Sequence, residues 1–250
     1  MTPESDSLSN QTALITGGAQ RIGKAVTQAL AEAGVGVIIH YNRSGGDAEN
    51  LAADIRGNGG QAWTVGGDLS DPDAPPKIFA DAVDKAGPVS ILINNASIFP
   101  ESRLTEFTPE ELQQNINVNA LAPLLLSRAF ADQGLPGNIV NFLDTRVVSY
   151  DAEHAAYHVS KRMLHTLTRM MALEFAPRIR VNAIAPGVIL PPEGKDENYL
   201  EKLAKTNPLC AVGTLADITG SVLFLIRTGF ITGQIIYVDG GRHMKGAMYG

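Results

Sequence analysis

Short apolar runs alternate along the chain with longer stretches in which apolar side chains recur every three or four residues. The short runs predict β-strands near residues 12–16, 35–41, 61–66, 89–94, 138–143, 179–184 and 234–238. The periodic stretches predict helices near residues 21–33, 47–57, 75–86, 109–131, 154–175, 198–205 and 215–227. Some of the runs, such as Val-Ser-Ile-Leu-Ile at 89–93, are apolar on both faces, which is typical of a parallel sheet that helices cover on each side.

This regular alternation predicts a single-domain, doubly wound α/β fold of the Rossmann type, with a seven-stranded parallel sheet and helices on both faces. One helix start is clearly marked, because Thr108, Pro109 and Glu111 have the spacing of a capping box with proline in the first turn. Residues 1–10 are expected to form a flexible tail and residues 11–250 one domain. Ligands bind beyond the carboxyl ends of the strands in such a sheet, so the residues that follow each strand are the candidate site.

The composition narrows the class of protein. The chain has 250 residues, 44% of them hydrophobic and 18% charged, which suits one α/β domain with a large core. A net charge of −6 argues against nucleic-acid binding, and no apolar run approaches the roughly 20 residues that span a bilayer. The first residues lack the pattern of a signal peptide. Cys210 is the only cysteine, which excludes an intrachain disulfide and a cysteine-based zinc site and favours a cytoplasmic location.

A glycine-rich turn at residues 16–25 follows the first predicted strand, where phosphate groups are often held. Residues 18–24 match the spacing of a P-loop, but Ala25 stands where a magnesium-binding Ser or Thr is required. No glycine triplet has the Gly-x-Gly-x-x-Gly spacing. The pattern Thr-Gly-x-x-x-Gly-x-Gly of the short-chain dehydrogenases is matched except at its middle glycine, where Arg21 stands; the matching residues are Thr16, Gly17 and Gly23. The alternative is a tight turn that needs only a positive φ.

The loop after the second predicted strand favours NADPH over NADH. NAD-binding proteins usually carry Asp or Glu there, which hydrogen-bonds to the ribose 2′-hydroxyl. This chain has Tyr41-Asn42-Arg43-Ser44, in which Arg43 supplies a positive charge and its neighbours supply donors for a 2′-phosphate. The alternative is that Arg43 is a solvated loop charge. Asp68, after the third strand, is a candidate acceptor for the adenine amino group, or else a turn or N-cap residue.

Tyr157 and Lys161 place a phenol and an ammonium four residues apart, on one face of a predicted helix. A nearby cation stabilises phenolate and lowers the tyrosine pKa from its ordinary value of about 10, so that the tyrosine can exchange protons near neutral pH. The lysine can also hold the ribose hydroxyls. Asp144, which follows the strand predicted at 138–143, stands 13 residues before this tyrosine.

Together and in this order, these motifs resemble the short-chain dehydrogenase/reductase family over roughly residues 10–241. The matching pieces are Thr16-Gly17-x5-Gly23, Asp68-Leu69, Asn94-Asn95-Ala96, Asn119, Tyr157-x3-Lys161, Pro186-Gly187 and Asp239-Gly240-Gly241. The resemblance implies that Tyr157 is the general acid, that Lys161 orients the ribose and tunes Tyr157, and that Asn119 supports a water chain for protons. It also implies NADPH contacts at Gly17, Arg21, Ile22, Tyr41, Asn42, Arg43, Ser44, Asp68, Leu69, Asn95, Ala96, Ser97, Tyr157, Lys161, Pro186 and Gly187.

Two departures from the general family pattern are informative. The family usually has Ser where this chain has Asp144, and Arg21 replaces the middle glycine of the turn. Both departures resemble the pteridine reductase branch, and some segments resemble bacterial dihydromonapterin reductases in particular. The segments concerned are 40–44, 94–99, 141–144, 185–190 and 239–243. The resemblance implies that Phe99 stacks on a pterin substrate, that Arg21 contacts the cofactor phosphate and the pterin, and that Asp144 works with Tyr157 in proton delivery.

The expected activity is the NADPH-dependent reduction of a dihydropterin to a tetrahydropterin. Asp144 should raise the pKa of Tyr157 and Lys161 should lower it, and the sequence leaves the net direction open. Alternatives exist at each substrate residue: Asp144 could pair with Arg146, Phe99 could be ordinary packing, and the arginine of the turn could serve the cofactor alone. Two other functions compete, namely a carbonyl reductase of the same family, acting on a 3-oxoacyl thioester, sugar or steroid, and a catalytically silent NADP-binding sensor.

The remaining candidates lie on the helix predicted at 154–175 and after it. His154 and His158 are four residues apart, but no glutamate follows the first as a His-Glu-x-x-His site requires, and no metal is expected. An apolar stripe is expected in the core or at a subunit interface; it comprises Met163, Leu164, Leu167, Met170 and Met171. The resemblance implies a homotetramer or homodimer that uses this helix and the helix at 109–131. Residues 191–207 are a candidate lid over a small-molecule substrate.

Overall fold

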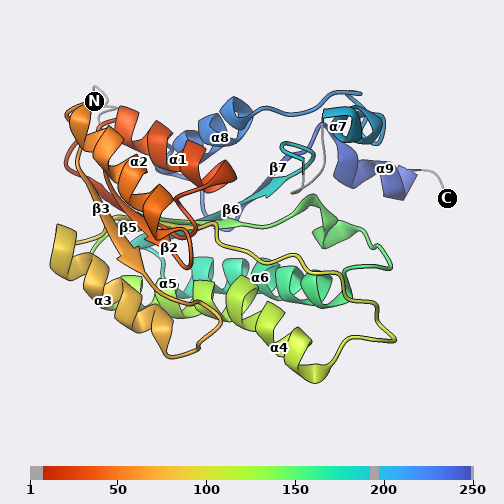
Figure 1. Cartoon of the computed structure of the whole chain (residues 1–250), viewed down its shortest axis with the longest axis horizontal. Coiled ribbons are helices and arrows are strands. Elements are labelled where there is room, and N and C mark those ends of the chain that lie inside the picture. The colour runs from red at the N-terminus through yellow and green to blue at the C-terminus, as the bar shows by residue number, and fades with distance from the viewer. Residues whose placement is uncertain (1–7, 192–196, 249–250) are drawn as a thin grey trace.

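The computed structural model describes residues 8–191 and 197–248. Residues 1–7 of the tail predicted at 1–10 and residues 192–196 of the lid predicted at 191–207 therefore lie outside the described residues. The seven predicted strands form one sheet (Figure 1). In chain order they are β1 (Thr12–Ile15), β2 (Gly36–Tyr41), β3 (Ala62–Gly66), β4 (Ile91–Asn94), β5 (Gly137–Phe142), β6 (Ile179–Pro186) and β7 (Ile235–Val238).

The sheet confirms the predicted doubly wound fold. Its strand order is β3-β2-β1-β4-β5-β6-β7, and all neighbouring strands are parallel. Strands β2 and β3 are added on one side of β1 and strands β4 to β7 on its other side, so the strand order reverses between β1 and β4, which are neighbours. In open sheets of this kind, the crevice beyond the carboxyl ends of such a strand pair is where ligands bind.

Helices cover both faces of the sheet (Figure 1). One face carries α1 (Arg21–Glu32), α2 (Gly45–Gly57) and α8 (Leu215–Arg227), and the other carries α3 (Ala74–Ala86), α5 (Ala122–Asp132) and α6 (Ala155–Glu174). The other α-helices of the described chain are α4 (Pro109–Ile116), α7 (Glu197–Ala204) and α9 (Arg242–Met248). The last of these and a short 3-10 turn, Thr145–Val148, are additions that the hydrophobic pattern did not predict.

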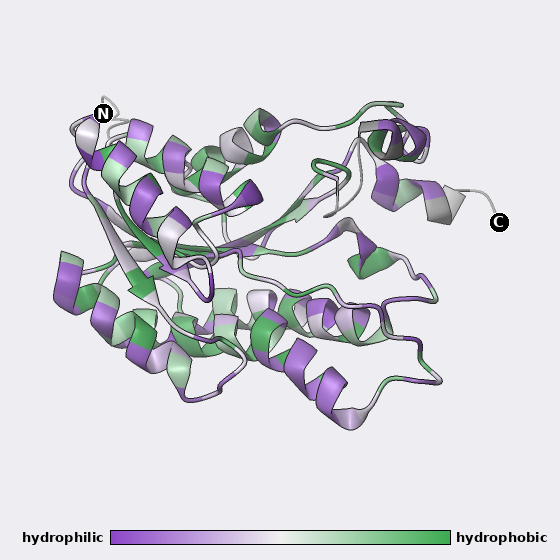
Figure 2. Cartoon of the chain, viewed as in Figure 1, coloured by the Kyte–Doolittle hydropathy of each residue, from purple (hydrophilic) through white to green (hydrophobic). Residues whose placement is uncertain are grey.

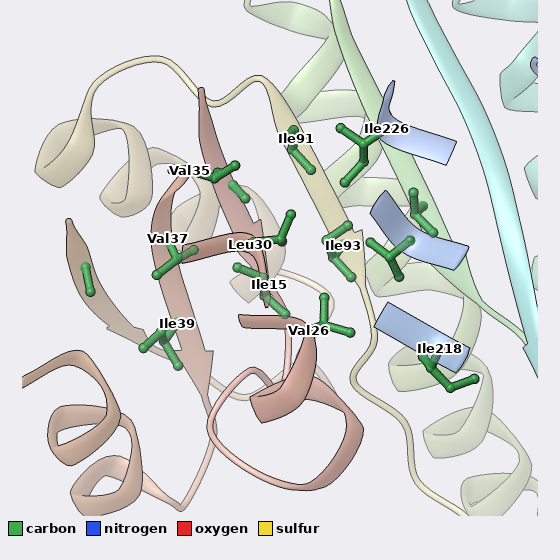
Figure 3. Close-up of a cluster of buried hydrophobic side chains, with 14 of the residues drawn as sticks. Ile15, Val26, Leu30, Val35, Val37, Ile39, Ile91, Ile93, Ile218 and Ile226 are labelled. Carbon is green, nitrogen blue, oxygen red and sulfur yellow. The ribbon is translucent and has the colours of Figure 1, made fainter. Parts of the chain in front are cut away.

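Alternate residues of each strand enter the two layers of the core, as the period of a β-strand requires. In β1, Ile15 packs with Val26 and Leu30 of α1, whereas Leu14 joins the opposite layer with Leu126 and Phe130 of α5. Figure 3 shows the first of these layers, with side chains from β1, β2, β4, α1 and α8 converging. The helices carry both hydrophilic and hydrophobic residues along their length (Figure 2), as expected for helices with one buried side.

The helix predicted over 109–131 contains a π-helical turn, Asn117–Leu121, between α4 and α5. Its predicted capping box is confirmed, because the Glu111 amide donates to the Thr108 hydroxyl (3.2 Å) and the Thr108 amide to the Glu111 carboxylate (2.8 Å). Pro123 has no N–H, so the carbonyl of Asn119 lacks its usual α-helical donor. The local sequence therefore favours the irregular turn that surrounds Asn119.

Candidate active site

A cavity of about 920 Å³ lies beyond the carboxyl ends of β1, β2, β3 and β4. Many of the predicted cofactor residues line it, namely Gly17, Arg21, Ile22, Tyr41, Asn42, Arg43, Ser44, Asp68, Leu69, Asn95, Ala96 and Ser97. The other predicted cofactor residues, Tyr157, Lys161, Pro186 and Gly187, lie outside its lining. The structure thus gathers residues from four separate loops around one hollow, as the sequence predicted for a dinucleotide site.

The glycine-rich turn is held by the loop after β4. The Thr16 hydroxyl accepts hydrogen bonds from the amides of Asn95 (2.9 Å) and Ala96 (3.0 Å). The Asn95 side chain donates in turn to the carbonyls of Thr16 (2.9 Å) and Gly17 (3.2 Å). A Cβ atom at Gly23 would lie 2.1 Å from the Gly17 carbonyl oxygen, so only glycine fits there.

His40 joins this turn to the loop after β3. Its Nδ1 accepts from the Gly17 amide (3.3 Å), which leaves Nε2 to donate to the Gly67 carbonyl (3.2 Å). Burial lowers the pKa of His40 to about 4, so the ring is neutral at physiological pH. Sequence reasoning noted His40 only as part of a branch resemblance and missed this role. A histidine on a strand that is otherwise apolar was the available signal.

Asp68 makes a turn and also faces the cavity. Its carboxylate accepts from the Ser70 amide (2.9 Å), as the turn alternative predicted, and the side chain is exposed at the cavity wall. This hydrogen bond, with a smaller contribution from the charge of Arg43, holds the pKa of Asp68 below its usual value. The two interpretations of Asp68 are therefore compatible, since a turn residue can still offer an oxygen to a ligand.

Arg21 opens α1 with a φ of +51°, a left-handed conformation in which glycine is the least strained residue. This explains why the family pattern has glycine at the position. The guanidinium of Arg21 lines the cavity and donates to the Pro191 carbonyl (2.7 Å). It thereby connects the glycine-rich turn to the segment that follows β6.

Tyr157 and Asp144 form a direct pair. The Tyr157 hydroxyl donates to one carboxylate oxygen of Asp144 (2.8 Å), and the Arg146 amide donates to the other (2.7 Å). The guanidinium of Arg146 pairs instead with Asp151, at 3.0 Å. The alternative in which Asp144 serves mainly as the ion-pair partner of Arg146 is therefore not what the structure shows.

The direction of the Tyr157 pKa, left open by the sequence, is upward. Burial is the largest cause, followed by the charge of Asp144 and its hydrogen bond, whereas Arg146 acts in the opposite direction. Lys161 is buried below the ring, with Nζ 5.8 Å from the ring centre, and donates to the Phe142 carbonyl (2.8 Å). Burial lowers the pKa of Lys161 to about 8, and Asp144 partly offsets this effect.

Phe99 lies beside Tyr157 rather than in the core. Its ring stacks on His154 at 3.9 Å between ring centres and meets the Tyr157 ring edge-on at 4.6 Å. The guanidinium carbon of Arg146 lies 5.0 Å from the centre of the same ring. Because 44% of the Phe99 surface remains exposed, the ring lies at the surface of the site and not in the core.

Known proteins are similar to this chain in sequence. A family model described as enoyl-(acyl carrier protein) reductase matches residues 17–243. The chain belongs to the short-chain dehydrogenase/reductase family. Among curated members of this family, versicolorin reductase 1 of Aspergillus parasiticus is 33% identical, with 94% of this chain and 97% of the relative covered. The 3-oxoacyl-[acyl-carrier-protein] reductase of Synechocystis sp. is 31% identical, with 95% and 98% covered.

One similar solved structure is FolM alternative dihydrofolate reductase 1 from Brucella canis, which is complexed with NADP. It is 35% identical, with 96% of this chain and 97% of that chain covered, and the TM-score is 0.91. This neighbour confirms the resemblance to the pteridine reductase-like branch of the short-chain dehydrogenase/reductase family.

Two family motifs have clear structural roles here. The side chain of Asn119 accepts from Ser97 and Ile98 and donates to the Ile98 carbonyl and the Ser160 hydroxyl, all within 3.0 Å. It thus positions the loop that leads to Phe99 against α6. A Cβ atom at Gly187 would lie 2.6 Å from the Cα of Asp239, so this glycine, after Pro186, allows β6 and β7 to end side by side.

Asp239, at the end of β7, is bonded to the loop that carries Asp144. The Thr145 hydroxyl donates to Asp239, and the His243 amide of α9 donates to the same oxygen (2.7 Å). Burial raises the pKa of Asp239, but these bonds and the His243 ring outweigh it and hold the pKa below its usual value. Helix α9 is thereby tied to the loop that carries Asp144.

The apolar stripe predicted on α6 divides between two sides of the helix, because Leu164 and Met171 are buried while Met163 and Met170 are exposed. No helix in the described part of the chain is long and apolar enough to cross a membrane. Within the same part, no group of three His, Cys, Asp or Glu side chains is arranged to hold a metal ion.

Proposed function

We propose that the chain is an NADPH-dependent reductase that converts a dihydropterin to a tetrahydropterin. The observation that carries the proposal is the hydrogen bond of 2.8 Å from Tyr157 to Asp144 beside the half-exposed ring of Phe99. A pterin is flat and rich in polar ring atoms, so an aromatic surface next to a paired phenol and carboxylate suits it. The Brucella canis neighbour is named as an alternative dihydrofolate reductase, which supports a pterin-like substrate.

The chemistry of the cavity fits NADPH. The N-cap residues of α1 and α2, Gln20 and Ser44, make no side-chain bond to the first turn, which leaves backbone amides for the phosphates. Arg43, next to the start of α2, adds the positive charge that a 2′-phosphate requires. The NADP complexes of the Brucella neighbours support the same assignment.

The proposed reaction assigns the proton to Tyr157. Bound NADPH supplies a hydride to a ring carbon of the substrate. Tyr157 gives its proton to the adjacent ring nitrogen, since its raised pKa keeps the phenol protonated at neutral pH. Asp144 orients the hydroxyl. Because Asp144 is only partly buried, it would also pass a proton from solvent to Tyr157 for the next cycle. The ammonium of Lys161, still mainly charged at neutral pH, offsets the phenolate.

Phe99 and Arg21 are proposed to hold the substrate. Phe99 supplies the stacking surface next to the Tyr157 hydroxyl. Arg21 lines the cofactor cavity and now donates to Pro191, so a substrate or phosphate oxygen would take the place of that carbonyl. Pro191 is the first residue of the proposed lid, and residues 197–207, which are also described, form its later part. The lid role itself stays a proposal.

The test is the oxidation of NADPH by the purified protein, compared on dihydrobiopterin, dihydromonapterin and acetoacetyl thioester. Turnover on the pterins and not on the thioester is expected. Turnover on the thioester alone would overturn the pterin assignment and leave only the cofactor and the Tyr157–Lys161 pair. Tight NADPH binding without turnover on a broad panel of substrates would favour the catalytically silent sensor.

A carbonyl reductase is the second candidate, because relatives of this chain are named as versicolorin reductase and 3-oxoacyl-[acyl-carrier-protein] reductase. Such an enzyme needs Tyr157 and Lys161 but has no evident use for Asp144. Its activity should therefore survive Asp144→Ser.

We further propose that the protein is cytoplasmic and forms a homodimer or homotetramer. An exposed apolar side of α6, which carries Val159, Met163, Met170 and Leu173, supports the oligomer.

A further inference from the structure

Arg146 lies where three parts of the site meet. Its amide donates to Asp144, and its guanidinium carbon is 5.0 Å from the centre of the Phe99 ring. The same ring meets Tyr157 edge-on at 4.6 Å. A flat substrate that covers the exposed part of the Phe99 ring and reaches the Tyr157 hydroxyl would therefore come close to the guanidinium of Arg146.

Asp151 fixes this guanidinium in advance. Its carboxylate pairs with Arg146 at 3.0 Å and with the Nδ1 of His154 at 3.0 Å, and it accepts from the amides of Glu153 and His154. Asp151 thus holds the two groups that contact the Phe99 ring, the stacked imidazole of His154 and the guanidinium of Arg146. Despite its partial burial, these bonds hold the pKa of Asp151 well below its usual range, so the anchor stays charged.

The guanidinium is still available to a ligand. It has five N–H donors, and the ion pair with Asp151 engages it through Nη1. The Arg146 side chain is 25% exposed. The guanidinium therefore keeps N–H donors that Asp151 does not engage, and it lies next to the Phe99 ring.

We propose that Arg146 is a specificity-determining residue that donates a hydrogen bond to an exocyclic carbonyl oxygen of the ring bound on Phe99. The proposal rests on the proposed function, because a pterin carries such an oxygen. A guanidinium has donors and no acceptor, so a ring with an amino group at that position would face donor with donor. The bound oxygen would thus distinguish an oxo-pterin from its diamino analogue.

The experiment compares Arg146→Gln, Arg146→Lys and a matched control, Arg103→Gln. Arg103 pairs with Glu153 at 3.8 Å, with both side chains largely exposed, so the control removes a nearby arginine that does not touch Phe99. At saturating NADPH, the KM for dihydropterin and the Ki of 2,4-diaminopteridine are measured for each protein. Arg146→Gln should raise KM about tenfold, the loss expected for a hydrogen bond to a charged group, and leave Ki unchanged or lower.

The ratio of Ki to KM separates substrate contact from a structural role. An equal change in both constants, or no change beyond that of Arg103→Gln, would overturn the assignment of Arg146. Arg146→Lys keeps a charge for Asp151 without the planar fork, so it should move the ratio in the same direction and decides the question if Arg146→Gln does not fold. If the unaltered protein neither reduces dihydropterin nor binds the diamino compound, the proposed function fails and the Arg146 assignment fails with it.

Discussion

The Tyr157 hydroxyl donates a 2.8 Å hydrogen bond to Asp144, a carboxylate at a position where the family usually has serine. A serine in this place can donate to a substrate oxygen, whereas an ionised carboxylate can only accept. The pair therefore orients the phenol proton, and the charge of Asp144 adds to burial, the largest cause, in raising the pKa of Tyr157. We propose that this one departure from the usual family residue alters which kind of substrate the site can serve.

Removal of the phenol hydroxyl should abolish the reaction and spare the cofactor. Tyr157→Phe keeps the ring that lies against Phe99 and Lys161 and loses only the hydroxyl group. We expect turnover to fall by at least about 100-fold, the usual contribution of a general acid, with NADPH affinity changed little. Steady-state rates and fluorescence titration with NADPH measure the two quantities. Near wild-type turnover would refute the role of Tyr157.

Replacement of Asp144 should distinguish the two candidate functions. Asp144→Ser restores the usual family residue and removes the acceptor for Tyr157. If the substrate is a pterin, we expect a loss of turnover of about 100-fold, since proton delivery is disrupted. Asp144→Asn is the control of equal size, because it keeps a hydrogen-bonding oxygen without the charge. A variant with serine that reduces a 3-oxoacyl thioester at an undiminished rate would establish the carbonyl reductase instead.

The activity should decline on the alkaline side near the pKa of Lys161. Burial lowers this pKa to about 8, so the ammonium loses its proton as the pH rises through that value. The charge that offsets the Tyr157 phenolate then disappears. We expect kcat/KM to fall above about pH 8. In Lys161→Arg any residual activity should persist to higher pH, because a guanidinium stays charged. An unchanged alkaline limb in that variant would argue against Lys161 as the titrating group.

The protein should lose stability as the pH falls from about 6.5 to about 4 because of His40. Its pKa is lowered to about 4 in the folded state, so the unfolded chain takes up a proton first and is favoured across this range. The full effect is about 3 kcal/mol of unfolding free energy. Denaturant titrations at several pH values measure it. His40→Gln serves as the reference, and an identical pH slope in both proteins would show that His40 is not responsible.

Gly23 should tolerate no side chain. A Cβ atom there would lie 2.1 Å from the Gly17 carbonyl oxygen in the glycine-rich turn and 2.6 Å from the side-chain nitrogen of Asn95, which holds that turn. Gly23→Ala should therefore weaken NADPH binding by more than about tenfold and lower stability by about 1–3 kcal/mol. Gly220→Ala on α8 is the matched control, because nothing lies within 4 Å of its added carbon. Calorimetric titration with NADPH and thermal unfolding check both effects.

The sequence predicted the sheet and most helices because their apolar periods are long and regular. It did not predict the π turn around Asn119, although the missing N–H of Pro123 was a visible signal. It also missed α9, whose place depends on the distant acceptor Asp239. Such partners are brought together only by the fold.

The electrostatics of the site were less predictable than its residues. Asp144 could have paired with Arg146 two residues on, and local spacing alone could not show that Asp151 takes the guanidinium. The direction of the Tyr157 pKa depends first on burial, which no motif encodes. The family resemblance predicted which residues form the site. The three-dimensional structure was needed to assign their ion pairs and the directions of their pKa shifts.

The bond between Thr145 and Asp239 has a genetic consequence. A premature stop codon after Val238 would spare every strand of the sheet. It would still delete the acceptor that anchors the residue next to Asp144. Lesions at the 3′ end of the reading frame should therefore impair catalysis before they impair the accumulation of folded protein.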